Sequence, residues 1–347
     1  MKMMKTLAYK DIGKIVLEER PVPHVTEPFE VVIKVSACGI CGTDVKIMEG
    51  KHVVGEDIAI GHEFCGVVTE IGSHVTSIKI GDRVAVDNSL RCGLCESCRT
   101  GNSPQCDWLK TKSIGIFQNG GYAEYCLLPE NACFKIPDSM DDITATQVET
   151  LGTVINGMKT VQIQCWDTVV ILGFGPIGYL FAALAKNAAA KVLVTEIDPF
   201  RIGVAKQLGV PVLNPDEVDL EKEILAFTDG KGAEVVIDAC GSQLENAIKY
   251  VMPAGKILAF GMDSSIKANV IPNTITRKAI KLLGTYIGQD TIVPAIKILE
   301  SGKIDMKPFF TEVIPIEKGV SSFGKLGLDL GTLKHIPKQA MKIVIKP

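Results

Sequence analysis

The chain has 347 residues, of which 46% are hydrophobic and 22% are charged, and its net charge is −3. This length predicts two domains, and the near-neutral charge argues against a nucleic-acid or anionic-membrane partner. The N-terminal stretch lacks the apolar core of a secretory signal, and no apolar run reaches the roughly 18 residues that span a bilayer. We therefore expect a cytoplasmic protein.

Residues 1–153 alternate short apolar runs with glycine turns, a pattern that predicts antiparallel strands in a barrel-like arrangement. Two glycine-flanked turns in this region, CGICGTD and GHEFCG, carry Cys41, His62 and Glu63. One sulfur, one nitrogen and one oxygen with an open fourth position are typical of a catalytic zinc site. A buried free thiol beside a surface His–Glu pair explains the same spacing equally well.

Four cysteines follow within one short loop, at Cys92, Cys95, Cys98 and Cys106. Disulfides between such close neighbours would be strained and are rare in the cytosol, and a thioredoxin-like pair would open a helix instead of standing in a Gly- and Pro-containing loop. Four thiolates suit tetrahedral zinc, whereas the seven-residue gap before Cys106 fits the iron–sulfur spacings less well. The loop over 91–106 is therefore predicted to hold structural zinc, which braces it without an open position for chemistry.

Residues 164–198 read as strand, turn, helix and strand, and the turn carries the pattern G-x-G-x-x-G. Such a turn, between a strand and a helix, lets pyrophosphate approach bare backbone at the positive end of the helix. The predicted dinucleotide-binding residues are Gly173, Phe174, Gly175, Pro176, Ile177 and Gly178.

Glu196 ends the second strand, about 20 residues after the glycines. A carboxylate there accepts hydrogen bonds from the ribose diol and repels a 2′-phosphate, which favours NAD over NADP. Arg201 stands nearby and could favour the phosphate instead. Further apolar runs at 234–242, 256–262 and 279–288 fit strands of the same parallel sheet.

The cysteine turn CGICGTD, the histidine turn GHEFCG, the four-cysteine loop and the glycine pattern occur in the order typical of zinc-dependent alcohol dehydrogenases. From about residue 5 to the C-terminus the sequence resembles the medium-chain dehydrogenase superfamily, particularly its sorbitol- and threonine-dehydrogenase-like branch. The resemblance implies an α/β protein with a chaperonin-10 (GroES)-like catalytic domain over 1–153 and a Rossmann NAD-binding domain over 154–295. The β-rich segment 296–347 would return to the catalytic domain, and the cleft between domains would hold zinc and nicotinamide.

The resemblance also implies roles for single residues. Cys41, His62 and Glu63 match metal ligands, and Glu149 matches the remaining one, although Thr150 stands where a proline is usual. Thr43 matches the hydroxyl that receives the alcohol proton, and Asp44 matches the residue that supports the histidine. Thr153 matches a threonine that contacts the nicotinamide. Cys38 is expected to be a packed neighbour of the ligand cysteine. Thr43 could also cap a helix that starts at Asp44.

The implied activity is reversible oxidation of a secondary alcohol or polyol to the ketone, with two zinc ions per chain, NAD, and a homodimer or homotetramer. Two departures bear on this activity. Lys46 stands where relatives often place a relay histidine, and Ile287 and Gly288 stand where sorbitol-type enzymes carry an arginine–tyrosine pair that grips the polyol. The alternatives are a dehydrogenase for an amino or phosphorylated alcohol, or a non-catalytic, zinc-stabilised NAD-binding protein. Zinc-free quinone or enoyl reduction is disfavoured by both metal constellations.

Overall fold

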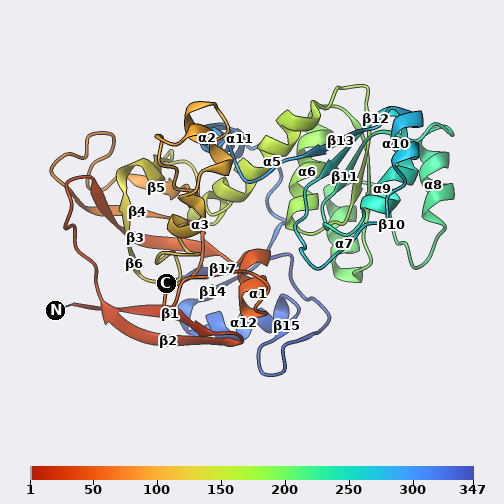
Figure 1. The fold of residues 1–347 in the computed structure, drawn as a ribbon. Helices are drawn as coiled ribbons and strands as arrows, with labels where there is room; N and C mark the ends of the chain where they lie inside the picture. Colours follow the sequence, from red (N-terminus) through yellow and green to blue (C-terminus); the bar gives the residue numbers. More distant parts are fainter. Residues whose placement is uncertain (1) are drawn as a thin grey trace. The chain divides into compact units, whose positions relative to one another are not determined.

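The computed structural model describes residues 2–347, which divide into two compact units (Figure 1). The first unit runs to Gly152 and also takes in Ile287–Gly302 and Phe310–Pro347, and the second comprises Thr153–Tyr286 and Lys303–Phe309. Helix α5 (Val148–Val161) begins in the first unit and ends in the second. No helix in the described part of the chain is long and apolar enough to cross a bilayer.

The first unit is built on a seven-stranded sheet of order β14-β17-β3-β4-β5-β7, with β6 paired to β3 beside this path. All its pairs are antiparallel except β14 with β17. Its strands, together with the hairpins β1–β2 and β15–β16, are β1 (Met3–Asp11), β2 (Lys14–Pro21), β3 (Glu30–Gly39), β4 (Glu63–Ile71), β5 (Arg83–Val86), β6 (Tyr125–Pro129), β7 (Cys133–Lys135), β14 (Phe310–Pro315), β15 (Leu328–Asp329), β16 (Lys334–His335) and β17 (Lys342–Lys346).

Short helices connect these strands, and the unit's apolar core lies against the sheet, with Ile33, Phe64 and Ile343 fully or almost fully buried. The helices are α1 (Gly42–Met48), α2 (Glu96–Arg99), α3 (Leu109–Lys112), α4 (Asp142–Ala145), α11 (Ile292–Glu300) and α12 (Gly319–Lys325), with 3₁₀ turns at Ser103–Gln105, Glu130–Ala132 and Ile316–Lys318.

The register of the sheet brings three distant segments together. Gly39 at the end of β3 pairs with Glu63 at the start of β4, and also with Val344 of β17. The turn that follows β3 therefore lies beside the residues that precede β4. A side chain at Gly39 would lie 2.5 Å from Glu63 Oε2, so glycine is needed to leave room for that carboxylate.

The second unit is a six-stranded parallel sheet of order β10-β9-β8-β11-β12-β13, which is the doubly wound order of the Rossmann fold and confirms the predicted α/β class. Its strands are β8 (Thr168–Leu172), β9 (Lys191–Thr195), β10 (Val212–Leu213), β11 (Ala233–Asp238), β12 (Val251–Ala259) and β13 (Lys281–Gly284). Its helices are α6 (Pro176–Asn187), α7 (Pro199–Leu208), α8 (Leu220–Phe227), α9 (Leu244–Tyr250) and α10 (Pro272–Lys278). Figure 1 shows these strands surrounded by the helices.

Local sequence explains the βαβ unit that holds the glycine turn. The apolar residues of β8 are buried on both faces of the sheet, as expected for a central parallel strand. Helix α6 begins with Pro176, whose missing N–H costs nothing in the first turn. Helix α7 begins at the side chain of Asp198, which accepts the N–H of Arg201 at 3.0 Å, and ends at Gly209 in the left-handed conformation.

Candidate active site

Three predicted metal ligands meet where β3 ends and β4 begins, at one end of these two interior strands. Cys41 caps α1, while His62 and Glu63 stand at the start of β4. One ligand atom from each lies within 4.8 Å of the others. Cys38, three residues before Cys41 on β3, is fully buried, and burial raises its pKa well above the usual range, so it stays a packed thiol.

The buried atoms around His62 fit a metal site. Asp44 Oδ1 and His62 Nδ1 face each other at 3.5 Å as an ion pair, and neither atom has a hydrogen-bond partner among the described residues. Burial acts to lower the pKa of His62, but the negative charges of Cys41 and Asp44 outweigh it and raise the pKa well above its usual value. With Nδ1 turned to a carboxylate, the imidazole presents its other nitrogen, as metal-binding histidines do.

Glu63 is held by a buried lysine. Lys342 Nζ lies 2.6 Å from Glu63 Oε2 and 2.9 Å from Oε1, and both side chains are almost completely buried. Thr150 donates to Oε1 at 2.6 Å and Gln147 donates to Oε2 at 3.4 Å. Burial acts to raise the pKa of Glu63, but Lys342 and His62 outweigh it and lower the pKa. Both oxygens of Glu63 are therefore engaged by donors other than a metal.

Glu149 is a second carboxyl group near the three clustered ligands. It lies outside the group of three residues whose ligand atoms come within 4.8 Å, yet it interacts electrostatically with His62 and Glu63. Burial raises its pKa to about 7. It lines a cavity of about 230 Å³ together with Asp87, Arg91 and Thr291. Because an approaching cation would stabilise its ionised form, Glu149 suits a ligand position that fills only when metal binds.

The segment after the second unit's sheet forms one wall of this cavity. Arg91 donates to the carbonyl oxygen of Gly288 at 2.5 Å and to Asp87 Oδ2 at 3.0 Å, so a guanidinium from the cysteine loop lies beside Gly288. A side chain at Gly288 would lie 2.7 Å from Thr291 Oγ1, so a larger residue there would have to displace that hydroxyl.

The four-cysteine loop forms a compact cluster. Its four sulfur atoms lie within 4.8 Å of one another, and Cys106 Sγ is 3.6 Å from Cys92 Sγ. The backbone N–H groups of Leu94 and Cys95 point at Cys92 Sγ and lower the pKa of that thiol to about 6. Donors aimed at a sulfur stabilise the thiolate that zinc requires, so the loop fits the ion predicted from its spacing.

The glycine turn fits a dinucleotide. Gly173 has φ of +94°, and a side chain there would lie 2.2 Å from Cys240 Sγ. At Gly178 a side chain would lie 2.1 Å from the carbonyl oxygen of Gly173, so α6 packs closely against the turn only because the residue is glycine. Among the intervening residues, Phe174 is buried, and Pro176 and Ile177 start α6.

Glu196 is fixed against this turn. Its Oε2 accepts the N–H of Phe174 at 3.0 Å, and its Oε1 accepts the N–H groups of Ile197 and Asp198 at 2.8 and 3.0 Å. Arg201 Nη1 lies 3.9 Å from Glu196 Oε2, and its guanidinium covers the space beside Gly175. A carboxylate and a guanidinium therefore lie side by side at the glycine turn, an arrangement that fits the adenosine ribose of a dinucleotide.

The two predicted threonines lie on helices. Thr43 lies in the first turn of α1 and is half-buried, but Cys41 is the N-cap of that helix. The expectation that Thr43 caps a helix starting at Asp44 is therefore wrong. Asp44, at the third position of the helix, instead accepts the backbone N–H of Cys41 at 2.8 Å, as the third residue of a capping box does. Thr153 lies on α5, in the second unit.

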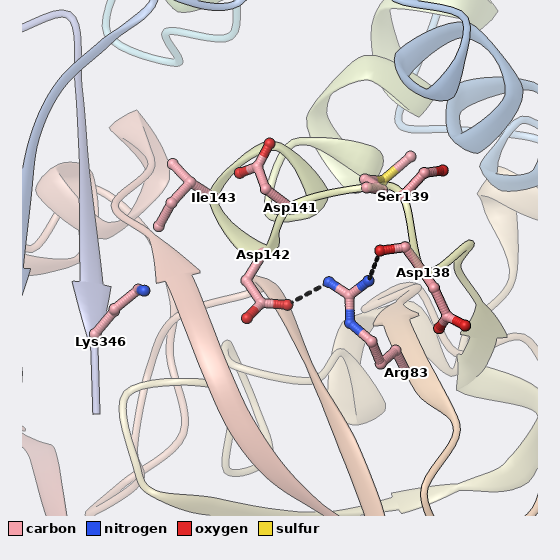
Figure 2. Close-up of a pocket in the computed structure, with 8 residues that line it drawn as sticks. Arg83, Asp138, Ser139, Asp141, Asp142, Ile143 and Lys346 are labelled. Atoms are coloured by element: carbon pink, nitrogen blue, oxygen red, sulfur yellow. Dashed lines mark hydrogen bonds and ion pairs between the residues drawn. The ribbon is translucent and has the colours of Figure 1, made fainter.

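A larger hollow, of about 460 Å³, lies on the first unit around Arg83 and Lys346 (Figure 2). Arg83 donates to Asp142 Oδ1 at 2.6 Å and to the carbonyl oxygens of Pro137 and Asp138 at 3.0 and 3.3 Å. None of the candidate metal ligands lines this hollow, and its guanidinium is already paired. It therefore brings no chemistry to the site.

Comparison with known proteins identifies the family. Residues 27–138 match the model of the alcohol dehydrogenase GroES-like domain, and residues 176–301 match that of the zinc-binding dehydrogenase. Sorbitol dehydrogenase of Bacillus subtilis is 31% identical over 91% of this chain and 91% of its own. D-xylulose reductase A of Aspergillus oryzae is 30% identical over 93% of this chain and 94% of its own. The chain belongs to the zinc-dependent medium-chain dehydrogenases, in their polyol dehydrogenase branch.

Solved structures of this family share the fold over the whole chain. A zinc-binding dehydrogenase of Sinorhizobium meliloti 1021 bound to NADP has a TM-score of 0.92 and 26% identity, with 100% of both chains covered. An alcohol dehydrogenase of Escherichia coli CFT073 with NADH has a TM-score of 0.90 and 28% identity, again with both chains fully covered. The predicted GroES-like and Rossmann architecture of this dehydrogenase is confirmed.

Three functional contacts of the dehydrogenase escaped prediction. Lys342 and Tyr122 reach the site from segments that carry no motif, and Thr150 supplies a hydroxyl to Glu63 where a proline was expected. A signal was present for Lys342, because a lysine between Met341 and Ile343 interrupts an apolar strand. A cation in such a place needs a buried anion.

Proposed function

We propose that this dehydrogenase catalyses the reversible oxidation of a secondary alcohol or polyol to the ketone, with hydride transfer to NAD. The observation that carries the proposal is the meeting of Cys41, His62 and Glu63 within 4.8 Å of one another in a chain that also has an intact glycine turn. A sulfur, nitrogen and oxygen donor set with exchangeable members is the arrangement of catalytic zinc.

Cys41 and His62 would hold the catalytic zinc, with Glu149 as the next ligand and Glu63 as an exchangeable one. When bound, zinc polarises the oxygen of the substrate as a Lewis acid, and NAD accepts the hydride. Asp44 orients the imidazole of His62. Thr43, two residues after Cys41 in the first turn of α1, would take the proton from the alcohol. The cysteine loop would hold a second, structural zinc at Cys92, Cys95, Cys98 and Cys106.

We propose NAD over NADP because the carboxyl group of Glu196 accepts three N–H groups and is held beside the glycine turn. Such a carboxylate can accept from the ribose hydroxyls and repels a phosphate at the same place. Gly173, Gly175 and Gly178 would hold the pyrophosphate at the start of α6, and Thr153 would contact the nicotinamide. Arg201 would contact the ribose or adenine.

Polyols are the proposed substrate class, in line with the names of the two curated relatives. The cavity beside Glu149 supports an uncharged substrate. Its charged lining comprises three carboxyl groups, Asp87, Glu149 and Asp290, against the single guanidinium of Arg91. An excess of acidic groups disfavours phosphorylated substrates, while carboxylates, a guanidinium and the hydroxyls of Ser89 and Thr291 can all bond to substrate hydroxyls. We further propose that the protein acts in the cytoplasm as a homo-oligomer.

The test is a screen for NAD reduction over short secondary alcohols, polyols and polyol phosphates, with zinc content measured on the same sample. We expect activity on polyols and two zinc ions per chain. Cys41→Ser should lose activity and one of the two ions, whereas Cys165→Ser, which changes an exposed thiol, should keep both. Equal rates for wild type and Cys41→Ser would contradict the proposed ligand.

A further inference from the structure

Asp44 is a buried carboxylate whose two oxygens face different partners. Its Oδ1 faces His62 Nδ1 at 3.5 Å, and its Oδ2 accepts the N–H of Cys41 at 2.8 Å. The residue is completely buried, so solvent does not fix the rotation of the carboxylate. The direction in which Oδ1 points therefore depends on what else is bound to Oδ2.

The second partner of Oδ2 is the phenol of Tyr122, which donates to it at 2.9 Å. Tyr122 lies 78 residues further along the chain and is completely buried. A bond to a carboxylate in a low-dielectric interior is among the stronger hydrogen bonds in proteins. The hydroxyl of Tyr122 and the N–H of Cys41 together hold one oxygen of Asp44 and leave the other for His62.

Tyr122 is held in place by its backbone and by its ring. Its backbone N–H donates to Ile60 at 3.0 Å, and its carbonyl accepts from Leu7 at 2.8 Å. The ring packs against Gly61, where a side chain would lie 2.3 Å from Tyr122 Cδ1. Gly61 directly precedes His62. These contacts tie the position of the hydroxyl to the segment that carries the imidazole of His62.

We propose that Tyr122 is a positioning residue of the catalytic metal site, acting through Asp44 on His62. By fixing Oδ2, its hydroxyl keeps Oδ1 in place to accept from His62 Nδ1, and this directs the other ring nitrogen toward the metal. The inference rests on the metal site of the proposed function. It differs from a purely space-filling role, for which phenylalanine would serve equally well.

The experiment compares zinc binding by full-length wild type and Tyr122→Phe, using competition with a chromophoric chelator. Removal of a group that bonds directly to a metal ligand typically lowers metal affinity about 10–100-fold. Tyr122 contacts the ligand His62 only through Asp44, so we expect a smaller loss of zinc affinity, about 3–10-fold. The loss should be confined to the Cys41–His62 site, with the four-cysteine site as internal reference. Cobalt substituted into the same site should show a shifted visible absorption spectrum in Tyr122→Phe.

Tyr125→Phe is the matched control, because its hydroxyl is exposed and accepts from Lys2 at 2.9 Å. It should leave both affinities unchanged. A second test places Tyr122→Phe in an Asp44→Asn background, where it should have no further effect on zinc affinity because the carboxylate it acts through is gone.

Unchanged zinc affinity and an unchanged cobalt spectrum in Tyr122→Phe would overturn the proposal. So would equal weakening of both zinc sites, which indicates a general loss of stability, or an undiminished effect in the Asp44→Asn background. The readout is metal affinity and not turnover. A chain that binds zinc more weakly in Tyr122→Phe but oxidises no alcohol would therefore contradict the proposed function while supporting this inference.

Discussion

Lys342 Nζ lies 2.6 Å from Glu63 Oε2, and this ion pair joins the last strand of the chain to the first residue of β4 inside the core. Lys342 also donates to the carbonyl oxygen of Ile40 at 3.1 Å, one residue before Cys41. Burial acts to lower the pKa of Lys342, but the charge of Glu63 outweighs it and raises the pKa. Lys342 thus contacts both segments that carry the predicted metal ligands, next to Cys41 through Ile40 and next to His62 through Glu63.

Replacing Lys342 with methionine should destabilise the protein by about 3–5 kcal/mol, because Glu63 is then left ionised and unpaired in the core. Urea unfolding of the zinc-loaded protein measures this loss. Lys342→Met combined with Glu63→Gln should cost less than the sum of the two single variants, since neither charge is then stranded. Additive losses would show that the two charges do not stabilise each other.

Glu149 predicts a pH dependence of zinc binding at the catalytic site. Its pKa of about 7 means that below this pH the carboxyl group is mostly protonated, and a metal that binds there must displace the proton. Zinc affinity should therefore rise with pH more steeply in wild type than in Glu149→Gln. Between about pH 5 and 7 the slopes should differ by one proton, or about tenfold in affinity per pH unit, and above about pH 8 they should converge.

Chelator competition at a series of pH values makes this measurement. Parallel pH profiles would contradict the assignment of Glu149 as a ligand.

Glu196 predicts the choice of cofactor. Glu196→Gln removes the charge but keeps the shape, and a hydrogen bond to a charged group is worth about 1.5–3 kcal/mol. We expect kcat/KM for NAD to fall at least about tenfold, while kcat/KM for NADP stays the same or rises. Glu217→Gln, which changes an exposed glutamate of the same unit, is the control and should alter neither value. An unchanged NAD-to-NADP ratio would remove Glu196 from the cofactor site.

Loss of the zinc in the cysteine loop should lower the stability of the protein without removing the catalytic zinc. Cys98→Ser should release one zinc per chain and leave the ion at Cys41 and His62. Opening a cross-link of this loop size costs about 3 kcal/mol by analogy with a disulfide, which lowers the unfolding temperature by roughly 5–10 °C for a domain of this size. Calorimetry and metal analysis of the same sample test both parts. If the unfolding temperature stays the same, the loop does not depend on the ion.

Arg91 ties this loop to the cavity beside Glu149, which gives Cys98→Ser a second expected effect. Arg91 directly precedes Cys92 and donates to Gly288, and Gln289 donates to the carbonyl oxygen of Gly101 within the loop. A loosened loop should therefore raise KM for the polyol more than it lowers kcat. Initial-rate kinetics at temperatures below the unfolding transition separate these two constants.

The features predicted correctly from the sequence are those whose residues are close together along the chain. The glycine turn, the strand before it and the helix after it follow each other without interruption, and all four cysteines stand within sixteen positions. In such segments the backbone itself brings the functional groups together, so residue type and spacing are sufficient. The order of these motifs along the chain is that of the family, and this resemblance predicted the GroES-like and Rossmann architecture.

Contacts between distant segments were decided by the tertiary structure alone. Cys41 and His62 meet because β3 pairs with β4 in a register that places Gly39 opposite Glu63. Lys342 reaches Glu63 across 279 residues, and Tyr122 reaches Asp44 across 78. A single lysine or tyrosine has no spacing to recognise. Its role depends on strand register and on burial, which determine whether a charge or hydroxyl must find its partner inside the protein, and neither is encoded in any short stretch of the chain.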